Sequence, residues 1–353
     1  MRLKELQKLA NELEIALSAL NLEELGLTDA GLSYFKFNLT KIKFNNQSNV
    51  YILYRILEKL TETDCSRISI IDHGAGIGFF GLLAKKCGIG QLICHDLSVE
   101  MIQDCRKISE ALNLGFDHYV VGDTDVLVDY CKMNNLEIHG LASRNVIEHI
   151  PDLDLFFGLL RQLPGEELVL VFTTSANIHN PAVHYQHVQI HKQHEVDGPY
   201  VDMMKTSINK QNSGRNIRRK IITELAPEIA GDQLEECITN TRALSLEQIK
   251  IFVKEFQQTK IIPRLQEKLS NTRDPYSGTW IERLVSYSDY KIVALKNGFL
   301  TESLAGFYNS YYSKFLWRIA ARSLNVVIKV LPMLHRNLSP FLALRFTRIK
   351  SNG

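Results

Sequence analysis

The chain has 353 residues, of which 45% are hydrophobic and 23% are charged, with a formal net charge of +2. This composition is ordinary for a globular chain of about two domains and excludes wholesale disorder. The small net charge excludes a global basic field for nucleic acid. The longest apolar stretch, residues 324–334, is too short to cross a bilayer. We therefore expect no nucleic-acid partner and no membrane-spanning helix.

The N-terminal part of the chain has a helical pattern. Leucine recurs every three or four residues between positions 3 and 20, and apolar residues have the same spacing in residues 50–60. Such periodicity predicts helices, so residues 1–62 are expected to form an N-terminal helical cap. The first residues lack the long apolar block of a secretory signal. The six cysteines contain no CxxC pair, which is typical of a reducing compartment, and we expect a cytoplasmic protein.

From residue 67 onward, short apolar runs alternate with helical windows. The expected strands are residues 68–71, 91–94, 118–121, 137–142 and 168–172. The expected helices between them are residues 79–87, 98–112, 124–133 and 153–163. Alternation of this kind indicates a parallel sheet with helices on both faces.

The alternation stops near Pro181, and residues 182–285 have helical periodicity without a strand pattern. A helix end at 290–295, a strand at 299–307, a helix at 313–331 and a strand at 341–349 follow. We expect an α/β fold: a Rossmann-like, doubly wound, mostly parallel seven-stranded sheet. Its core would comprise residues 63–181 and 286–353, and residues 182–285 would form a helical insertion after the fifth strand that caps the substrate.

A glycine-rich turn follows the first expected strand. Gly76, Gly78 and Gly81 satisfy G-x-G-x-x-G, and Asp96 lies 20 residues beyond Gly76, as a nicotinamide-cofactor site requires. However, Asp72 ends the strand two residues before the first glycine. A carboxylate there would repel a pyrophosphate and attract an ammonium or sulfonium group. The acid therefore favours a cationic cofactor over a dinucleotide.

Five segments in order resemble the motifs of class I S-adenosylmethionine-dependent methyltransferases of the small-molecule type. The turn at residues 72–78 reads D-x-G-x-G-x-G and resembles their first motif. Residues 94–98 and 121–123 resemble the turns after the second and third strands. Residues 143–152 are similar to the fourth-strand segment, and residues 298–299 resemble the glycine-phenylalanine before the sixth strand.

This resemblance implies S-adenosyl-L-methionine as the cofactor. Asp72 and the glycine backbone would hold its methionine part, Asp96 its ribose and Asp123 its adenine. The expected cofactor-binding residues are Asp72, Gly74, Gly76, Gly78, Asp96, Leu97, Met101, Gly122, Asp123, Asn145 and Val146.

Histidines supply the candidate catalytic groups. In enzymes of the similar family, a histidine at the place of His149 either shapes the cofactor pocket or acts as a base, and both readings stay open. Five further histidines fall within 16 residues, after the fifth expected strand: His179, His184, His187, His191 and His194. We predict His149, His179 and His184 as the catalytic residues.

The histidine run has three readings. It is a packed or solvated face, it orients and deprotonates substrate, or it binds a metal through His187 and His191, whose i, i+4 spacing allows chelation. No glutamate of the H-E-x-x-H kind lies between the histidines, so a hydrolytic zinc site is unsupported. We assign no metal ligands from the sequence.

The fourth-strand segment also bears on the acceptor. Methyltransferases of DNA bases or glutamine resemble one another in an Asn/Asp-Pro-Pro-aromatic turn where this chain has residues 143–146, Ser-Arg-Asn-Val. The expected function is therefore methyl transfer to a small-molecule, glycan or lipid-linked acceptor. Two alternatives remain: a nicotinamide-dependent oxidoreductase, and a non-catalytic scaffold of the same fold that binds a partner.

Two segments of the expected insertion have open roles. Six basic residues between 205 and 220, without an acid among them, form either a solvated face or a receptor for a phosphate- or carboxylate-bearing acceptor. Residues 271–280 are rich in turn formers and include Tyr276 and Trp280, which we expect to be exposed in a loop over a pocket.

The C-terminal helix expected at Ser313–Leu331 is amphipathic. Lys314, Arg318, Arg322 and Lys329 fall on one face and apolar residues largely on the other, and no acid follows Glu302. A helix of this kind can make peripheral contact with an anionic membrane. The alternative, which we favour at this stage, is that its apolar side packs on the sheet and its basic side is solvated.

Overall fold

The computed structural model describes residues 2–198, 210–264 and 271–350. The chain divides into two compact units. The first, here called the sheet unit, comprises Met1–Ile147, Asp152–Thr174 and Tyr287–Gly353. The second, here called the insertion unit, comprises Glu148–Pro151 and Ser175–Ser286. The N-terminal helices thus belong to the same unit as the sheet.

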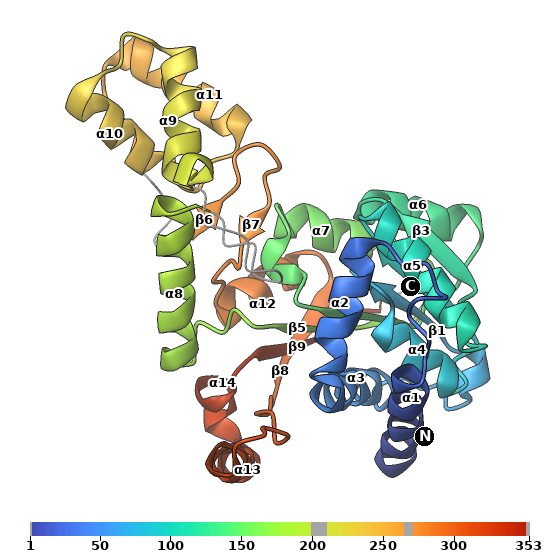
Figure 1. Ribbon diagram of the computed structural model, residues 1–353. Helices are drawn as coiled ribbons and strands as arrows, with labels where there is room; N and C mark the ends of the chain where they lie inside the picture. The colour runs from blue at the N-terminus through green and yellow to red at the C-terminus, as the bar shows by residue number, and fades with distance from the viewer. Residues whose placement is uncertain (1, 199–209, 265–270, 351–353) are drawn as a thin grey trace. The chain divides into compact units, whose positions relative to one another are not determined.

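A seven-stranded sheet forms the centre of the sheet unit (Figure 1). Its order is β3-β2-β1-β4-β5-β9-β8. The first five strands are parallel, and β9 runs antiparallel to both β5 and β8. This topology confirms the predicted doubly wound, mostly parallel sheet. The strands are β1 (Ser69–His73), β2 (Gln91–Asp96), β3 (His118–Val121), β4 (Gly140–Arg144), β5 (Val169–Thr174), β8 (Phe299–Leu304) and β9 (Leu342–Arg348).

Burial explains why these runs form central strands. Every residue of β1 and β5 is buried, as expected for parallel strands covered on both faces. The fourth strand begins at Gly140, later than the expected residue 137, because the Ile138 N–H bonds to the Pro164 carbonyl outside the ladder. The helices that follow β1 to β4 are α4 (Phe79–Lys86), α5 (Val99–Ala111), α6 (Thr124–Met133) and α7 (Leu153–Leu160), and α12 (Tyr287–Lys296) precedes β8.

The N-terminal helices α1 (Leu3–Ser18), α2 (Asp29–Leu39) and α3 (Ile42–Leu57) share the core of the sheet. Leu6 and Leu13 are fully buried in the same cluster as Ile70 of β1. The start of α2 is fixed to α5 by the buried Asp104 carboxylate, which accepts hydrogen bonds from the N–H (3.0 Å) and hydroxyl (2.6 Å) of Thr28. These contacts hold α2 in a defined place on the sheet unit.

The helix after β8, α13 (Phe315–Val330), does not bury its apolar side on the sheet as we favoured from sequence. Ala321 and Ile328 are its buried residues. The Asn325 side chain accepts a hydrogen bond from the N–H of Tyr308 (2.6 Å) and donates one to the Tyr308 carbonyl (2.9 Å). Because Asn325 shares the side of the helix with the two buried residues, the opposite, apolar side faces outward. The short helices η5 (Pro332–Leu334) and α14 (His335–Leu338) follow.

The insertion unit is mostly helical. It contains α8 (Pro181–Val196), α9 (Gly214–Leu225), α10 (Gly231–Asn240) and α11 (Leu246–Thr259), and the last three gather at one end of α8 (Figure 1). Ile222, Ile238 and Ile249 belong to the small core that these three share. A strand pair that the sequence analysis missed, β6 (Thr272–Arg273) and β7 (Trp280–Ile281), flanks the turn-rich residues. Strands of two residues have no periodicity to detect.

The basic run expected between residues 205 and 220 is largely paired with acids. The guanidinium of Arg218, 1% exposed, forms two hydrogen bonds with the Glu195 carboxylate, at 3.1 and 2.6 Å. Arg215 and Arg219 both pair with Glu235. Lys205 lies outside the described residues. This surface therefore offers little free positive charge to a phosphate- or carboxylate-bearing acceptor.

No helix among the residues that the structure describes is both long and apolar enough to span a membrane.

The Arg218–Glu195 pair should dominate the stability of the insertion unit. Arg218→Met would leave a buried carboxylate without its bidentate partner, and we expect a loss of about 3–5 kcal/mol. Adding Glu195→Met should recover part of that loss, because it removes the buried charge, although Arg242 then loses the carboxylate that lies 3.3 Å from it. The measurement is urea denaturation followed by Trp280 fluorescence in a Trp317→Phe background, since the chain has two tryptophans. Equal stability of the single and double variants would contradict this account.

Candidate functional site

Two acidic side chains hold the glycine-rich turn between β1 and α4 and the first turn of α4. Asp72, on β1, accepts a hydrogen bond from the N–H of Gly81 (3.0 Å). Asp96, at the end of β2, accepts one from the N–H of Gly76 (2.8 Å) and another from the N–H of Ser98 (2.9 Å). The turn is therefore connected to the carboxyl ends of two neighbouring strands, where open α/β sheets bind ligands.

Each glycine of this turn lies where an added side chain would meet a different neighbour. Gly74 has φ +67°, and a Cβ there would lie 2.4 Å from Cγ2 of Val146. The fold thus brings together two residues that we predicted at the cofactor. A Cβ at Gly78 would lie 2.4 Å from Sγ of the buried Cys105, so this glycine is required for packing of α4 against α5. A Cβ at Gly76 would lie 3.2 Å from the ring of Tyr34.

Burial strongly perturbs the Asp72 carboxyl. Its removal from water raises the pKa of Asp72 to about 7, against the lowering effect of the hydrogen bond from Gly81. The negative charge of Asp96 raises this pKa further, and the Arg144 guanidinium lowers it. Near neutral pH, Asp72 is therefore poised to take up or lose a proton when a charged ligand binds.

Two residues near the turn were missed from sequence. Arg144, at the end of β4, donates a hydrogen bond to Oδ1 of Asn45 in α3 (2.7 Å), and burial lowers the pKa of its guanidinium. Tyr34 comes from α2 and lies beside Gly76. Arg144 precedes the predicted Asn145 in the sequence, but the resemblance of residues 143–152 to the fourth-strand segment implied no function for Arg144. Tyr34 had no sequence signal, since its place depends on how α2 packs.

The remaining predicted cofactor residues lie at the ends of neighbouring strands. Leu97 follows β2 and is 71% exposed, and Met101 of α5 is half-buried. Gly122 has φ +140°, and Asp123 caps α6 by accepting the N–H of Thr124 (2.6 Å). Asn145 has a left-handed φ of +55°. Parallel strands end at one edge of a sheet, so these positions share the edge with Asp72 and Asp96.

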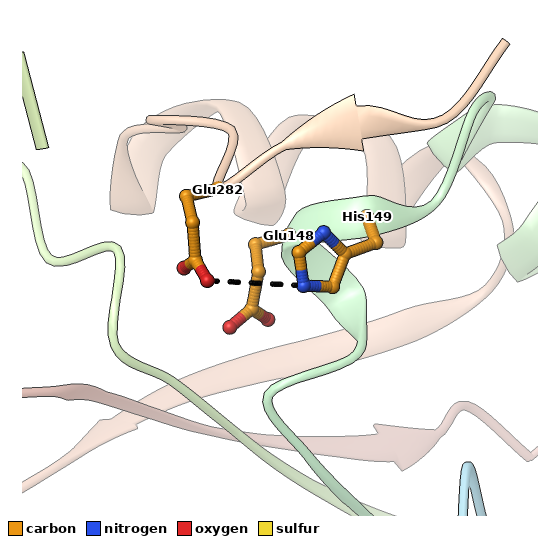
Figure 2. A group of neighbouring side chains, drawn as sticks. All are labelled: Glu148, His149 and Glu282. Carbon is orange, nitrogen blue, oxygen red and sulfur yellow. Dashed lines mark ion pairs between the residues drawn. The ribbon is translucent and has the colours of Figure 1, made fainter. Parts of the chain in front are cut away.

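A group of neighbouring ionisable side chains lies in the insertion unit. Glu148, His149 and Glu282 each offer one ligand-type atom, and these three atoms lie within 4.8 Å of one another. Glu148 is fully buried, whereas the other two are partly exposed. Figure 2 shows Glu148 and His149 on the segment after β4 and Glu282 just after β7, with the three side chains directed toward one another.

His149 and the neighbouring His187 of α8 both carry the proton on Nδ1. Nδ1 of His149 lies 2.9 Å from the Trp280 carbonyl, and Nδ1 of His187 lies 2.9 Å from the Val183 carbonyl. A carbonyl oxygen only accepts, so in both rings Nδ1 carries the proton and donates. The two Nε2 atoms then approach the Glu282 carboxylate, at 3.9 Å from His149 and 3.6 Å from His187.

Glu282 is ionised at neutral pH. Burial raises its pKa, but the neighbouring His187 and His149 imidazoles and the hydrogen bond from the Ser175 hydroxyl (2.9 Å) together hold the pKa of Glu282 below its usual value. Its backbone has a left-handed φ of +45°, an uncommon conformation for a glutamate. The sequence analysis missed both Glu282 and the role of His187, since only the fold brings them to His149.

His191 has a structural role. Its Nε2 donates to the Glu282 carbonyl (3.1 Å), and its Nδ1 accepts from the N–H of Thr272 (3.1 Å). Burial lowers the pKa of His191 to about 4, so the ring is neutral. Because both ring nitrogens are engaged, His187 and His191 do not form the chelating pair considered above.

The other predicted residues of this region are placed as follows. His179 donates its backbone N–H to Oδ1 of Asn177 (3.1 Å), and His184 lies in the first turn of α8. Both side chains are half-buried, and their catalytic roles stay predictions. Trp280, expected to be exposed, is 5% exposed and donates its indole N–H to the Pro151 carbonyl (3.1 Å).

The sheet unit also contains a cavity of about 710 Å³. Residues of α1, α3 and the segment 305–311 line it, together with Asn325 and Lys329 of α13. Its walls include Tyr51 and Tyr54 but none of the predicted cofactor-binding residues. This cavity is therefore a separate feature of the sheet unit.

No family model matches the chain, and no curated protein matches it in sequence. Solved structures with some likeness include an S-adenosylmethionine-dependent methyltransferase from Mesorhizobium loti, with 15% identity over 83% of this chain and 96% of that one, at a TM-score of 0.38. Another is phosphoethanolamine N-methyltransferase 2 from Haemonchus contortus in complex with S-adenosyl-L-methionine. Its identity is 13% over 86% of this chain and 52% of that one, at a TM-score of 0.36.

The raised pKa of Asp72 predicts a pH-dependent stability. The folded chain binds this proton more tightly than the unfolded chain, whose aspartate titrates near pH 4, so stability falls as the pH rises from about 4 to 7. Asp72→Asn keeps an oxygen for the N–H of Gly81 but removes the buried charge. Without ligand, the variant should therefore gain melting temperature over the unmodified chain at pH 8 and much less at pH 5. Thermal unfolding across this range tests the prediction, and parallel pH profiles for the two proteins would contradict it.

Proposed function

We propose that the protein is an S-adenosylmethionine-dependent methyltransferase. The observation that supports this function best is the buried carboxyl of Asp72 under a glycine-rich turn that Asp96 also holds. A buried acid at this place suits a cofactor with a positive charge and opposes a pyrophosphate. The mostly parallel, seven-stranded sheet is the fold expected for such an enzyme.

Different residues of the sheet unit would bind different parts of the cofactor. Asp72 and the backbone of Gly74 and Gly76 would hold the methionine ammonium group, and Arg144 would face the methionine carboxylate. Asp96 would accept hydrogen bonds from the ribose hydroxyls, and Asp123 would accept one from the adenine amine. Leu97, Met101, Gly122, Asn145 and Val146 would complete the pocket wall.

The bound cofactor would supply a methyl group activated by its sulfonium. What this chain contributes is placement, because an in-line displacement gains most of its rate from holding two reactants at the right distance and angle. We propose His149, His179 and His184 as the residues that act at the acceptor, which we place among small molecules, glycans and lipid-linked precursors. We also propose that the enzyme works in the cytoplasm.

Ligand binding separates this proposal from its alternatives. A nicotinamide-dependent oxidoreductase would bind NAD, and a non-catalytic scaffold would bind neither NAD nor S-adenosylhomocysteine. Thermal-shift measurements with the two ligands therefore distinguish the three functions. Stabilisation by S-adenosylhomocysteine alone is the expected result, and methyl-labelled cofactor with cell extract followed by mass spectrometry would then identify the acceptor.

Substitutions in the turn should remove cofactor binding selectively. Gly76→Val places a branched side chain at φ +55° against Tyr34, so we expect no measurable affinity for S-adenosylhomocysteine. Asp96→Ala should weaken binding by tens-fold, since hydrogen bonds to a charged group contribute about 1.5–3 kcal/mol. Gly115→Ala is the matched control, because its Cβ would meet no atom within 4 Å. Calorimetric titration measures all three, and unchanged affinity in the first two variants would overturn the site assignment.

A further inference from the structure

We propose that Glu148, His149 and Glu282, whose ligand-type atoms lie within 4.8 Å of one another, form a binding site for a divalent transition-metal ion, with His187 as a fourth ligand through its Nε2, 3.6 Å from Glu282. The site belongs wholly to the insertion unit and does not depend on the proposed methyl transfer. Figure 2 shows three of its members directed toward a common centre. From sequence, His187 was considered as a metal ligand only together with His191, and Glu282 lies too far along the chain from His149 for the pattern to connect them.

The first argument is the orientation of the two imidazoles. A metal-binding histidine usually donates its second ring N–H to a carbonyl or carboxylate, which fixes the tautomer and aims the other nitrogen at the metal. His149 and His187 both donate from Nδ1 to backbone carbonyls at 2.9 Å. Their Nε2 atoms lie 3.9 and 3.6 Å from the Glu282 carboxylate oxygens. When the rings are neutral, each Nε2 carries a lone pair, and an ionised carboxylate has no proton to donate to it. A cation among these atoms would satisfy both lone pairs and the carboxylate.

The second argument is charge. Glu148 is fully buried, and one of its carboxyl oxygens lies within 4.8 Å of an oxygen of Glu282. Two carboxyl groups at this separation repel each other when both are ionised, particularly away from water. A divalent ion between them would convert this repulsion into attraction. Ser175 donates to Oε2 of Glu282 and would orient this carboxylate.

The donor set indicates the class of ion. Imidazole nitrogens favour zinc, iron and similar ions, whereas magnesium and calcium prefer sites built from oxygen alone. Two imidazoles with two carboxylates therefore fit Zn²⁺, Fe²⁺ or Mn²⁺. In this arrangement Nε2 of His149 would be a ligand of the ion. It would then hold the ion near the acceptor instead of accepting a proton from it.

Metal titration of the full chain tests the site. After treatment with a chelator, calorimetry with Zn²⁺ and with Mn²⁺ should show one ion bound per chain, and each ion should raise the melting temperature. Glu282→Gln and His149→Ala should each weaken binding by about tenfold or more, while Glu247→Gln on exposed α11 should not. Circular dichroism verifies that the variants are folded. Absence of binding, or equal affinity in all four proteins, would overturn the proposal.

A different observation concerns α13, whose apolar side is exposed. The side chains that face outward include Phe315 (65%), Leu316 (78%) and Val330 (68%). Ile319, Val326 and Val327 extend this surface along the helix, and Met333 continues it into η5. Within the described part of the chain, nothing covers it. We infer that this face lies in the interface of an anionic membrane.

Charge complementarity identifies the membrane as the occupant. Lys314, Arg318, Arg322 and Lys329 lie on the side of the helix next to the apolar face, and no acid follows Glu302. None of these four takes part in an ion pair among the described residues. Tyr311, Tyr312 and Trp317 are all exposed near the start of α13, and such side chains favour the membrane–water boundary. Basic residues beside an apolar face are typical of helices that lie on anionic lipid.

Vesicle binding tests this second inference. The full chain should co-sediment with phosphatidylserine-containing vesicles much more than with pure phosphatidylcholine vesicles, and high salt should weaken the binding. Leu316→Glu with Val330→Glu, and separately Arg322→Glu with Lys329→Glu, should each reduce binding by about tenfold or more. Ile251→Glu, at an exposed apolar position of α11, is the control and should bind normally. Failure to pellet at low salt, or concentration-dependent dimerisation lost in the Leu316→Glu and Val330→Glu variant, would overturn it.

Discussion

The fold around the glycine-rich turn depends on a carboxyl group that has been taken out of water. Asp72 is buried in the sheet, and its carboxyl accepts a hydrogen bond from the backbone N–H of Gly81 in α4. Burying a carboxyl raises the free energy of its charged form, so such a group persists only where the surrounding structure is well determined. The packing of α4 through Gly78 against Cys105, and of α2 through Asp104, provides that surrounding structure.

The same carboxyl links stability to ligand binding. A buried acid that is half protonated near neutral pH can respond to a cation by losing its proton, so a charged ligand would convert an unfavourable burial into an ion pair. The half-buried Arg144 guanidinium carries the opposite charge and lowers the pKa of Asp72. A zwitterionic ligand would satisfy both groups together, whereas a simple cation or anion would satisfy one of them.

The fold could be predicted from sequence because strand and helix periods alternate clearly between residues 67 and 174. Asp72, Asp96 and the glycines were found because they follow strands in a motif of fixed spacing. Arg144, Tyr34 and Glu282 were not found, since their places depend on packing between elements distant in sequence. The orientation of α13 was expected wrongly: amphipathicity gives the two faces of a helix, and the pairing of Asn325 with the backbone of Tyr308 decides which one turns inward.

The insertion unit is built from two separate stretches of chain, and this limits how it can be exchanged between proteins. Glu148–Pro151 belong to it although the residues on both sides belong to the sheet unit. The Glu148 carbonyl accepts the N–H of Arg283, and the Pro151 carbonyl accepts the indole N–H of Trp280. A chimera that replaces only residues 175–286 would remove the two donors, Arg283 and Trp280, and keep the two acceptor carbonyls. Four residues from the loop after β4 would have to be transplanted with the larger segment, so the two stretches form one unit of recombination.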